Sequence, residues 1–253
     1  MRLAVCLKHV ITRESHLRIN DAQTWIRDEA AAFELNEPDA YALEEALRLR
    51  EQHGGEVIAV SAGPDRVTHV LREALARGAD SAIHVAGDHL ATADARTTAA
   101  ALVEAVRKRP VDLLLSGLQS DDQGFGQVGV VLAELLGVPH VSLAVAIEST
   151  GDRLRVKREL EGGWFQWISL PLPALVTVQS GINQLRYATL KGIMAARKKE
   201  IQRVEVTAPQ SSDLRIVALQ APERKKTTEI IPGAASDAAR ELIRRLRETG
   251  SVG

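Results

Sequence analysis

Residues 117–129 are the best candidates for ligand chemistry in this chain. They read Gly-Leu-Gln-Ser-Asp-Asp-Gln-Gly-Phe-Gly-Gln-Val-Gly, with a G-x-G-x-x-G pattern from Gly124 to Gly129. An apolar segment follows from Val130, so the loop is expected to lead into a helix. Small residues at such a turn let backbone N–H groups approach a phosphate, and the helix N-terminus favours its negative charge. The loop therefore predicts a phosphate-bearing ligand.

The loop departs from an ordinary dinucleotide-binding fingerprint in two ways. That fingerprint occupies the first strand–helix turn of its unit, whereas here the first predicted strand leads into a long segment without it. Asp121 and Asp122 are also unfavourable neighbours for a phosphate, and they suit ribose hydroxyls or helix capping better. Glu148 does stand about 20 residues further on, where the fingerprint has an acid. A glycine-rich turn that only lets a helix pack closely stays open as an alternative.

Two further loops carry small and polar residues at strand–helix junctions. Asn36-Glu37-Pro38-Asp39 precedes a predicted helix, and Ser61–Pro64 follows the second predicted strand. Asn36 or Asp39 fits a helix cap, with Pro38 in the first turn, and either fits a ligand contact equally well. Ligands of open α/β sheets bind beyond the carboxyl ends of the strands. We expect all three loops at that edge, where they would share one pocket.

A sheet with covering helices must position these loops. Apolar runs alternate with helical periodicity up to about residue 145, which is typical of a mostly parallel sheet covered on both faces. The later segments are shorter, and Glu161-Gly162-Gly163 between two of them is typical of a hairpin turn. The predicted fold class is α/β with additional antiparallel strands. The predicted strands are Leu3–Leu7, Val57–Val60, Ser81–Val85, Asp112–Leu115, Ser142–Ile147, Arg153–Glu159, Trp164–Leu170 and Ala174–Val178, and helices are expected around Leu43–Leu47, Val67–Leu75 and Ala99–Val106.

Two segments lack this regular pattern. Residues 10–35 are expected to form an irregular ribbon inserted after the first strand, and residues 180–235 are expected to form an extended arm. A last amphipathic helix is predicted, with Ala239, Leu242, Ile243 and Leu246 on one face. An isolated helix is unstable in water. The arm therefore either folds back on its own domain or, as we expect, wraps around another subunit.

Composition narrows the classes of function. The chain has 253 residues, of which 45% are hydrophobic and 26% charged, as in ordinary globular proteins. A net charge of −1 gives no field toward nucleic acid or anionic membranes, and 3% aromatic residues leave no stacking platform for single strands. No stretch approaches the roughly 18 apolar residues of a membrane span, and the single cysteine, Cys6, suits a reducing compartment. We expect a cytoplasmic protein without nucleic-acid binding or membrane insertion.

No catalytic or metal-binding constellation is expected. The 7 histidines have no metal-ligand spacing with cysteine or acidic residues. No G-x-S-x-G elbow is present, and Cys6 falls in a predicted strand, where an inert buried thiol is the ordinary case. Redox chemistry in this chain would therefore have to come from a cofactor, with the protein supplying its position.

The segment from Arg186 to Lys199 reads RYATLKGIMAARKK and is neither a good strand nor a clean amphipathic helix. A basic tract beside Leu190, Ile193 and Met194 suits protein contact better than core packing. The segment strongly resembles the signature region of the beta subunit of electron transfer flavoproteins. The likeness covers most of residues 1–200 and includes, in the same order, the blocks Val5–Val10, Asn36–Ala46, Val57–Pro64, Gly117–Gly129 and Arg158–Gly163.

The resemblance implies a fold, a partner and cofactors. It implies a Rossmann-like adenine-nucleotide-binding domain over residues 1–185, and a recognition loop and C-terminal arm over residues 186–253 that wraps an alpha subunit. The alpha subunit would carry the redox-active FAD, and this chain would hold AMP or, in electron-bifurcating members, a second FAD. Leu190, with Ile193 and Met194, would dock partner dehydrogenases. The nucleotide pocket would involve Cys6, Asn36, Glu37, Pro38, Asp39, Ala62, Gly117, Gln119, Ser120, Asp121, Asp122, Gln123, Gly124, Phe125, Gly126, Gln127 and Val128.

The resulting prediction is the beta subunit of a heterodimeric electron carrier that passes electrons from dehydrogenases to a downstream acceptor via FAD, and is not a catalyst on its own. Its loop lacks the family's threonine-type hydroxyl and carries the bulky Phe125, which leaves AMP and a second FAD both open. The alternative from another class is a stand-alone nucleotide-binding regulator of the universal-stress type. Such proteins end soon after the sheet, so the long C-terminal extension argues against it. An NAD-dependent oxidoreductase is a further alternative, disfavoured by the missing acid–base groups.

Overall fold

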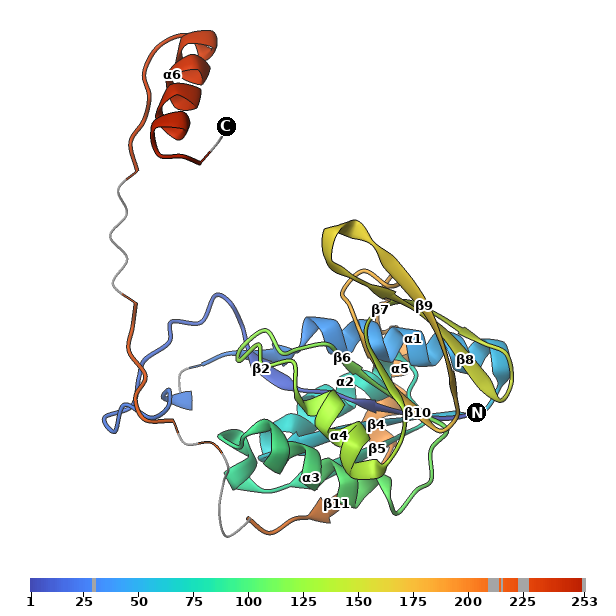
Figure 1. Cartoon of the computed structure of the whole chain (residues 1–253). Coiled ribbons are helices and arrows are strands. Elements are labelled where there is room, and N and C mark those ends of the chain that lie inside the picture. Colours follow the sequence, from blue (N-terminus) through green and yellow to red (C-terminus); the bar gives the residue numbers. More distant parts are fainter. Residues whose placement is uncertain (29–30, 209–213, 215, 223–227, 252–253) are drawn as a thin grey trace. The chain divides into compact units, whose positions relative to one another are not determined.

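The computed structural model describes residues 1–253 except 29–30, 209–213, 215, 223–227 and 252–253 (Figure 1). The described residues form two compact units, Met1–Leu219 and Gln220–Gly253. The first is an α/β unit, and the second contains the helix α6 (Ala235–Glu248), which confirms the predicted last helix. Within the described ranges, none of the helices is long and apolar enough to span a membrane.

A nine-stranded sheet organises the first unit (Figure 1). From one edge to the other its strands are β11 (Ile201–Glu205), β5 (Ser81–Ala86), β4 (Glu56–Gly63), β1 (Arg2–Cys6), β6 (Leu113–Gly117), β10 (Ala174–Val178), β7 (His140–Ser149), β8 (Arg153–Glu159) and β9 (Phe165–Pro171). Neighbours from β11 to β7 run parallel, and β8 and β9 extend the sheet as an antiparallel hairpin. The chain runs from β1 out to β4 and β5 and then crosses to β6, so the sheet changes its direction of growth at β1.

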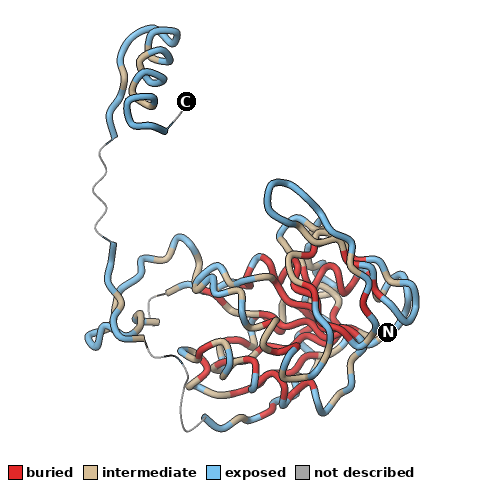
Figure 2. The backbone as a smooth tube through the Cα atoms, in the orientation of Figure 1, coloured by how far each residue is buried: buried red, intermediate tan, exposed pale blue. Residues whose placement is uncertain are grey.

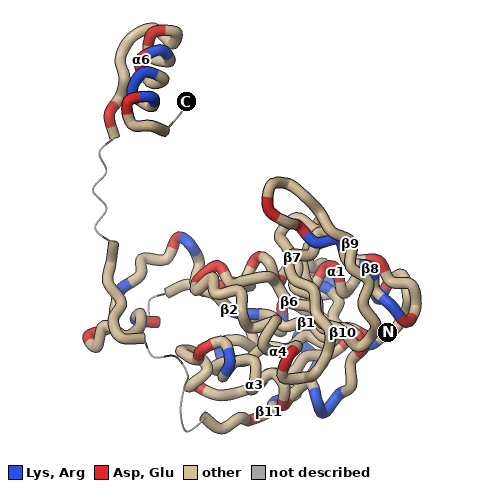
Figure 3. Tube along the Cα trace, viewed as in Figure 1, with Lys and Arg blue, Asp and Glu red and all other residues tan. Residues whose placement is uncertain are grey.

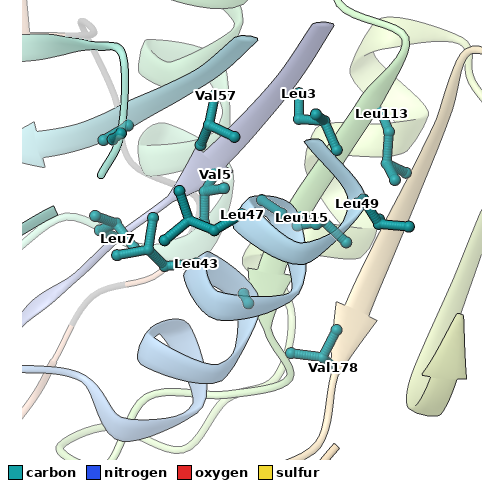
Figure 4. Close-up of a cluster of buried hydrophobic side chains, with 14 of the residues drawn as sticks. Leu3, Val5, Leu7, Leu43, Leu47, Leu49, Val57, Leu113, Leu115 and Val178 are labelled. Atoms are coloured by element: carbon teal, nitrogen blue, oxygen red, sulfur yellow. The ribbon is translucent and has the colours of Figure 1, made fainter. Parts of the chain in front are cut away.

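Helices cover both faces of this sheet, which confirms the predicted α/β class. The helices α1 (Glu37–His53) and α2 (Thr68–Arg77) contribute to one core, and α3 (Ala95–Val106) and α4 (Val128–Leu136) to the other. Side chains alternate along β1, because successive strand residues point to opposite faces. Leu3 and Val5 pack with Leu43 and Leu47 of α1, as Figure 4 shows, whereas Ala4 belongs to the opposite core. Buried residues accordingly concentrate along the strands and the inner helix faces (Figure 2).

A short ribbon follows the first strand, as predicted. The strands β2 (His9–Ile11) and β3 (Phe33–Leu35) pair antiparallel as a separate two-stranded sheet. Beyond them, Ile19 and Ile26 form an isolated bridge. This ribbon begins just after the carboxyl end of β1.

Short 3-10 helices lie at Asp65–Val67, Asp88–Ala91 and Glu161–Gly163, and the last of them falls within the predicted hairpin turn.

The segment after residue 180 is more regular than the sequence predicts. It contains the helix α5 (Leu190–Lys198) and β11, so the expectation of an extended arm is wrong for residues 190–205. The helix has 9 residues and buries only Ala196, and β11 is an edge strand that buries only Val204. Neither therefore shows a clear apolar period. Tertiary contacts stabilise both elements, because their own side chains do not: α5 packs against α2, and every residue of β11 pairs with β5.

Arginine side chains fix this segment to the first two helices. Arg72 of α2 donates to the carbonyl oxygen of Ala196 at 2.6 Å and to that of Lys199, which satisfies carbonyls at the end of α5. Arg186 donates through Nε and Nη2 to the two carboxylate oxygens of Glu44, at 2.8 and 3.0 Å. Glu44 is buried on α1, so its charge needs this bidentate partner.

Replacing Gly192 with alanine tests how closely α5 packs against α2. Helix propensity alone predicts a gain of roughly 0.5–1 kcal/mol, because glycine is a poor helix former. A Cβ atom here would lie 2.3 Å from the carbonyl oxygen of Ala76, a backbone atom that cannot rotate away. We expect Gly192→Ala to lower the free energy of unfolding by about 1–3 kcal/mol in urea denaturation. Lys191→Ala on the same helix is the control, and a stabilised Gly192→Ala protein would contradict the close contact.

Candidate functional site

A cleft opens at the carboxyl ends of β1, β4 and β6 in the first unit. It lies where the sheet changes its direction of growth, which is where open α/β sheets bind their ligands. Its walls come from the β1–β2 junction, the turn after β4, the start of α3 and the loop between β6 and α4. We call residues 117–129 of that last wall the glycine loop.

The carboxylate of Asp39 joins two of these strand ends. Its Oδ2 accepts a hydrogen bond from the backbone N–H of Lys8 at 2.8 Å, and its Oδ1 accepts one from the backbone N–H of Gly117 at 2.7 Å. Only glycine fits at position 117, since a Cβ there would lie 2.5 Å from Cβ of Pro38 and 2.7 Å from Oδ1 of Asp39. The first turn of α1 therefore clamps the ends of β1 and β6 together at the floor of the cleft.

Burial sets the protonation of this clamp. It raises the pKa of Asp39 to about 6, while the hydrogen bonds from the Lys8 and Gly117 backbones act in the opposite direction. The carboxylate is consequently ionised at neutral pH, and both of its oxygens are available as acceptors.

Asn36 fixes the glycine loop and does not cap α1 with its side chain. It occupies the N-cap position that the sequence suggested, but its side chain makes no capping hydrogen bond. Its Nδ2 donates to the carbonyl oxygen of Gln119 at 3.1 Å, and its Oδ1 accepts from the backbone N–H of Asp121 at 2.9 Å. The amide can do this because it offers both a donor and an acceptor, whereas an ionised aspartate at this position would offer acceptors alone.

The acidic residues of the glycine loop are neutralised by cations. Nζ of Lys8 donates to Oδ1 of Asp122 at 2.7 Å, and also to Ser120 and Gln123 at 3.1 and 2.9 Å. Asp121 lies 3.4 Å from a guanidinium nitrogen of Arg13. These pairs resolve the conflict that two aspartates would pose for an anionic ligand, because neither carboxylate is left uncompensated.

The glycines of the loop have two separate roles. Gly124 and Gly126 have φ of 65° and 63°, a region that favours glycine, and they let the loop turn into α4. Gly129 serves packing, since a Cβ there would lie 2.5 Å from Cγ2 of Thr177. The side chain of Gln127 does not cap α4, and Val128 and Gly129 of its first turn line the cleft. The packing interpretation of the loop therefore holds for Gly129, and phosphate binding by the loop stays a prediction.

Most of the predicted pocket residues come together in this cleft. Those that line it are Cys6, Asn36, Asp39, Ala62, Gly117, Gln119, Ser120, Asp122, Gln123, Phe125, Gly126, Gln127 and Val128, whereas Glu37, Pro38, Asp121 and Gly124 do not. Burial raises the pKa of the Cys6 thiol to about 12, so this wall holds a protonated, unreactive sulfur. Leu190, Ile193 and Met194 lie on α5 and do not line the cleft.

A second wall of the cleft was not expected from the sequence. The start of α3 borders the cleft, and Asp94 caps this helix by accepting the backbone N–H of Thr97 at 2.7 Å. An aspartate before an apolar periodic segment is a recognisable helix start, so this element could have been located from the sequence. The ribbon formed by β2 and β3 has no comparable sequence signature, so its lining side chains could not be located in this way. The missed lining residues include Lys8, His9, Trp25, Asp28, Phe33, Arg66, Leu90, Ala91, Ala93 and Thr98.

These features define a Rossmann-like α/β protein whose cleft, with an open helix N-terminus, suits a phosphate-bearing ligand. A sequence profile described as the electron transfer flavoprotein domain matches residues 24–209. The chain is 34% identical to electron transfer flavoprotein subunit beta of Methylophilus methylotrophus, with 98% of each chain covered. It is 33% identical to the subunits of the same name from Bacillus subtilis (strain 168) and Homo sapiens, covering 100% of this chain and 100% and 99% of theirs. The chain therefore belongs to the electron transfer flavoprotein family, as the resemblance predicted.

The pH dependence of stability tests which effect dominates at Asp39. Burial holds its pKa at about 6, above the ordinary 3.8, so the folded protein binds more protons than the unfolded chain between these values. The stability contributed by this group should then fall as pH rises from about 4 to about 6. The Asp39→Asn variant has no carboxyl to titrate in this window. As pH rises from about 4 to about 6, the unfolding free energy of the wild type should fall by about 3 kcal/mol relative to that of the variant.

Urea denaturation at four pH values between about 4 and 7.5 measures this difference. Asp152→Asn, in an exposed turn, controls for loss of one carboxylate. A wild type that gains stability over the variant as pH rises would show that the two backbone hydrogen bonds outweigh burial.

Proposed function

We propose that this chain is the beta subunit of a heterodimeric electron transfer flavoprotein. It pairs with an alpha subunit that carries the redox-active FAD, and the heterodimer passes electrons from partner dehydrogenases to a downstream acceptor. The observation that carries the proposal is the similarity to beta subunits along the whole chain, from 98% to 100% coverage. The cleft adds independent support, because it suits the nucleotide that such a role requires.

The cleft fits an adenine nucleotide, either AMP or the adenylate half of a second FAD. The open N-terminus of α4 would hold a phosphate through backbone N–H groups. Ser116 lines the cleft, and its buried Oγ has no partner among the described residues. Leu90 and Ala93 offer apolar surface for a base. A second FAD would supply a second redox centre, whereas AMP would supply none.

The protein's own groups in this cleft would act by positioning. Asp39 and Asn36 hold the glycine loop against the strand ends, and Lys8 keeps it compact. Their hydrogen bonds are satisfied within the chain, so the loop is preorganised before any ligand arrives. The nucleotide would then bind to a fixed frame at the centre of the sheet.

The exposed side of α5 is the proposed docking site for dehydrogenases. Leu190, Ile193 and Met194 are 75%, 40% and 60% exposed, which is unusual for large apolar side chains on one short helix. The opposite side of α5 is anchored to α2 through Ala196. A rigid support with an apolar exposed side is suited to transient recognition of a partner protein.

The C-terminal unit is the proposed arm that wraps the alpha subunit. None of the residues of α6 is buried, and Leu242 and Ile243 are 48% and 47% exposed. The rest of the helix carries charges of both signs, as Figure 3 shows. An amphipathic helix whose apolar side is uncovered needs a partner surface to be stable. We propose residues 1–185 as the nucleotide-binding domain and residues 186–253 as the docking segment and arm.

The alternative of a stand-alone regulator of the universal-stress type is not favoured. The similarity to electron transfer flavoproteins extends through the C-terminal region, and coverage is complete for two of the relatives. We propose a cytoplasmic location, in keeping with the single buried cysteine.

Nucleotide content of the heterodimer tests the cleft assignment. We expect two nucleotides per heterodimer purified with its alpha subunit, one FAD and a second that is AMP or FAD, quantified after denaturation by chromatography. Lys8→Met should weaken the second nucleotide about tenfold, because it removes the ammonium group that compacts the glycine loop. Lys108→Met, exposed at the end of α3, is the control. A heterodimer with one FAD and nothing else would count against the cleft as a nucleotide site.

Leu190→Ala tests the docking surface. We expect electron transfer from the partner dehydrogenase to slow about tenfold or more, because Leu190 is the most exposed of the three apolar side chains and a loss of about 1.4 kcal/mol in docking is a factor of ten. Heterodimer formation and flavin content should not change. Lys191→Ala on the same helix separates loss of apolar contact from loss of charge. Loss of flavin in Leu190→Ala would place this leucine in the fold or the subunit interface instead.

A further inference from the structure

The helix α5 carries exposed charges of one sign. Lys191, Arg197 and Lys198 are exposed, and within the described ranges none of them forms an ion pair or a side-chain hydrogen bond. No aspartate or glutamate occurs in residues 186–199. An exposed helix face ordinarily carries both signs, as in α6, where arginines pair with acids three or four residues away. The single sign on α5 therefore needs an explanation.

Acidic residues on the neighbouring helices do not offset these charges. Glu44 of α1 pairs with Arg186. Glu73 of α2 pairs with Arg77. Glu200, which follows α5, forms no ion pair with any of the three exposed cations. The exposed side of α5 therefore has a positive field of its own, although the net charge of the whole chain is −1.

The helix period places these cations beside exposed apolar side chains. Three such side chains, which we call the apolar strip, lie along α5: Leu190, Ile193 and Met194. Arg197 continues the strip, because it stands one turn beyond the last of these residues. Lys191 and Lys198 are two turns apart, so they share one flank of the strip. Ala196 marks the other side of the helix, which is buried.

Helix stability accounts for two of the cations but not for Lys191. Arg197 and Lys198 stand in the last turn of α5, where the helix dipole favours positive charge. Lys191 stands in the first turn, where the backbone N–H groups already carry partial positive charge, so a cation there is unfavourable for the helix. A lysine that lowers helix stability, and that has no partner in the part of the chain that the structure describes, points to a role outside the fold.

We propose that the dehydrogenase surface that binds α5 is an apolar pocket bordered by carboxylates, and that Lys191 contributes to the choice of partner. The apolar strip enters the pocket, while Lys191 and Lys198 face carboxylates along one side of it. Charge complementarity carries this assignment, because a pocket without carboxylates would leave the cations desolvated and unpaired. The inference rests on the proposed docking of dehydrogenases at α5 and adds the chemistry of the surface that docks there.

The salt dependence of electron transfer tests the carboxylate border. Reduction of the wild-type heterodimer by the partner dehydrogenase is followed by stopped flow at about 20 mM and about 300 mM NaCl. We expect the second-order rate constant to fall about tenfold at the higher concentration, because salt screens the attraction between the two surfaces. Poly-L-glutamate, which offers carboxylates without an apolar pocket, should compete with the dehydrogenase at low salt and slow the reaction.

Three variants separate charge from apolar contact. Lys191→Gln should react about threefold more slowly than the wild type at low salt and at the same rate at high salt, and poly-L-glutamate should slow it less. Leu190→Ala should be slower than the wild type at both salt concentrations, because salt does not screen an apolar contact. Lys108→Gln, which removes an exposed lysine at the end of α3, is the matched control and should react like the wild type throughout.

A rate constant that does not depend on salt, an equal loss for Lys191→Gln at both salt concentrations, or the same loss for Lys108→Gln would overturn the inference and leave the proposed function standing. Dissociation of the alpha subunit from the Lys191→Gln protein would make that subunit the occupant of this face and would also overturn it. A wild-type heterodimer that the dehydrogenase does not reduce would overturn the proposed function and the inference together. The salt dependence is measured on the wild type, so it stands even where a variant fails to fold.

Discussion

The geometry of the cleft depends on one buried carboxylate. Asp39 accepts backbone hydrogen bonds from residues 31 and 78 positions away in the chain, at the ends of neighbouring strands. Gly117 pairs with Val178 of β10 on one side, and the carboxylate accepts its N–H, which would otherwise be buried without a partner. Burial of an ionised group is unfavourable and raises the pKa of Asp39, and the two charge-assisted hydrogen bonds offset only part of this effect. The same constraint forces glycine at position 117, because the helix turn that carries the carboxylate approaches the strand backbone directly.

The helix α1 links this cleft to the proposed docking segment. Its first turn holds the glycine loop through Asn36, and its middle holds Arg186 through Glu44. Asn183 donates to the carbonyl oxygen of Tyr41 and to the carboxylate of Glu45, so the connection is made at several points. A nucleotide site and a protein-docking surface thereby share one rigid support. Each buried acid on α1 accepts a hydrogen bond from one of these segments, so displacing either segment would leave a buried acid with fewer partners.

Sequence patterns predicted the elements whose apolar residues are also the ones buried in the folded protein. Strand β10 was predicted over the residues it occupies, and the buried strands β1, β4, β5 and β6 were found because both their faces are covered. The helix α5 and strand β11 were missed because tertiary contacts stabilise them while their own side chains stay mostly exposed. At the site, sequence located the glycine loop and the Asn36–Asp39 turn. It could not show that Asn36 bonds to the loop instead of capping its helix, because both roles use the same amide atoms.

The pairing of charges in the glycine loop constrains how a phosphate could be held. Lys8 and Arg13 are engaged with Asp122 and Asp121, so the loop has little net charge to offer an anion. Recognition would then depend on backbone N–H groups at the start of α4, whose partial charges are fixed in direction and close to the ligand. Such contacts are directional and operate within hydrogen-bond range, so they discriminate by shape more than by charge. A bound nucleotide in this frame would be selected by its fit to the loop.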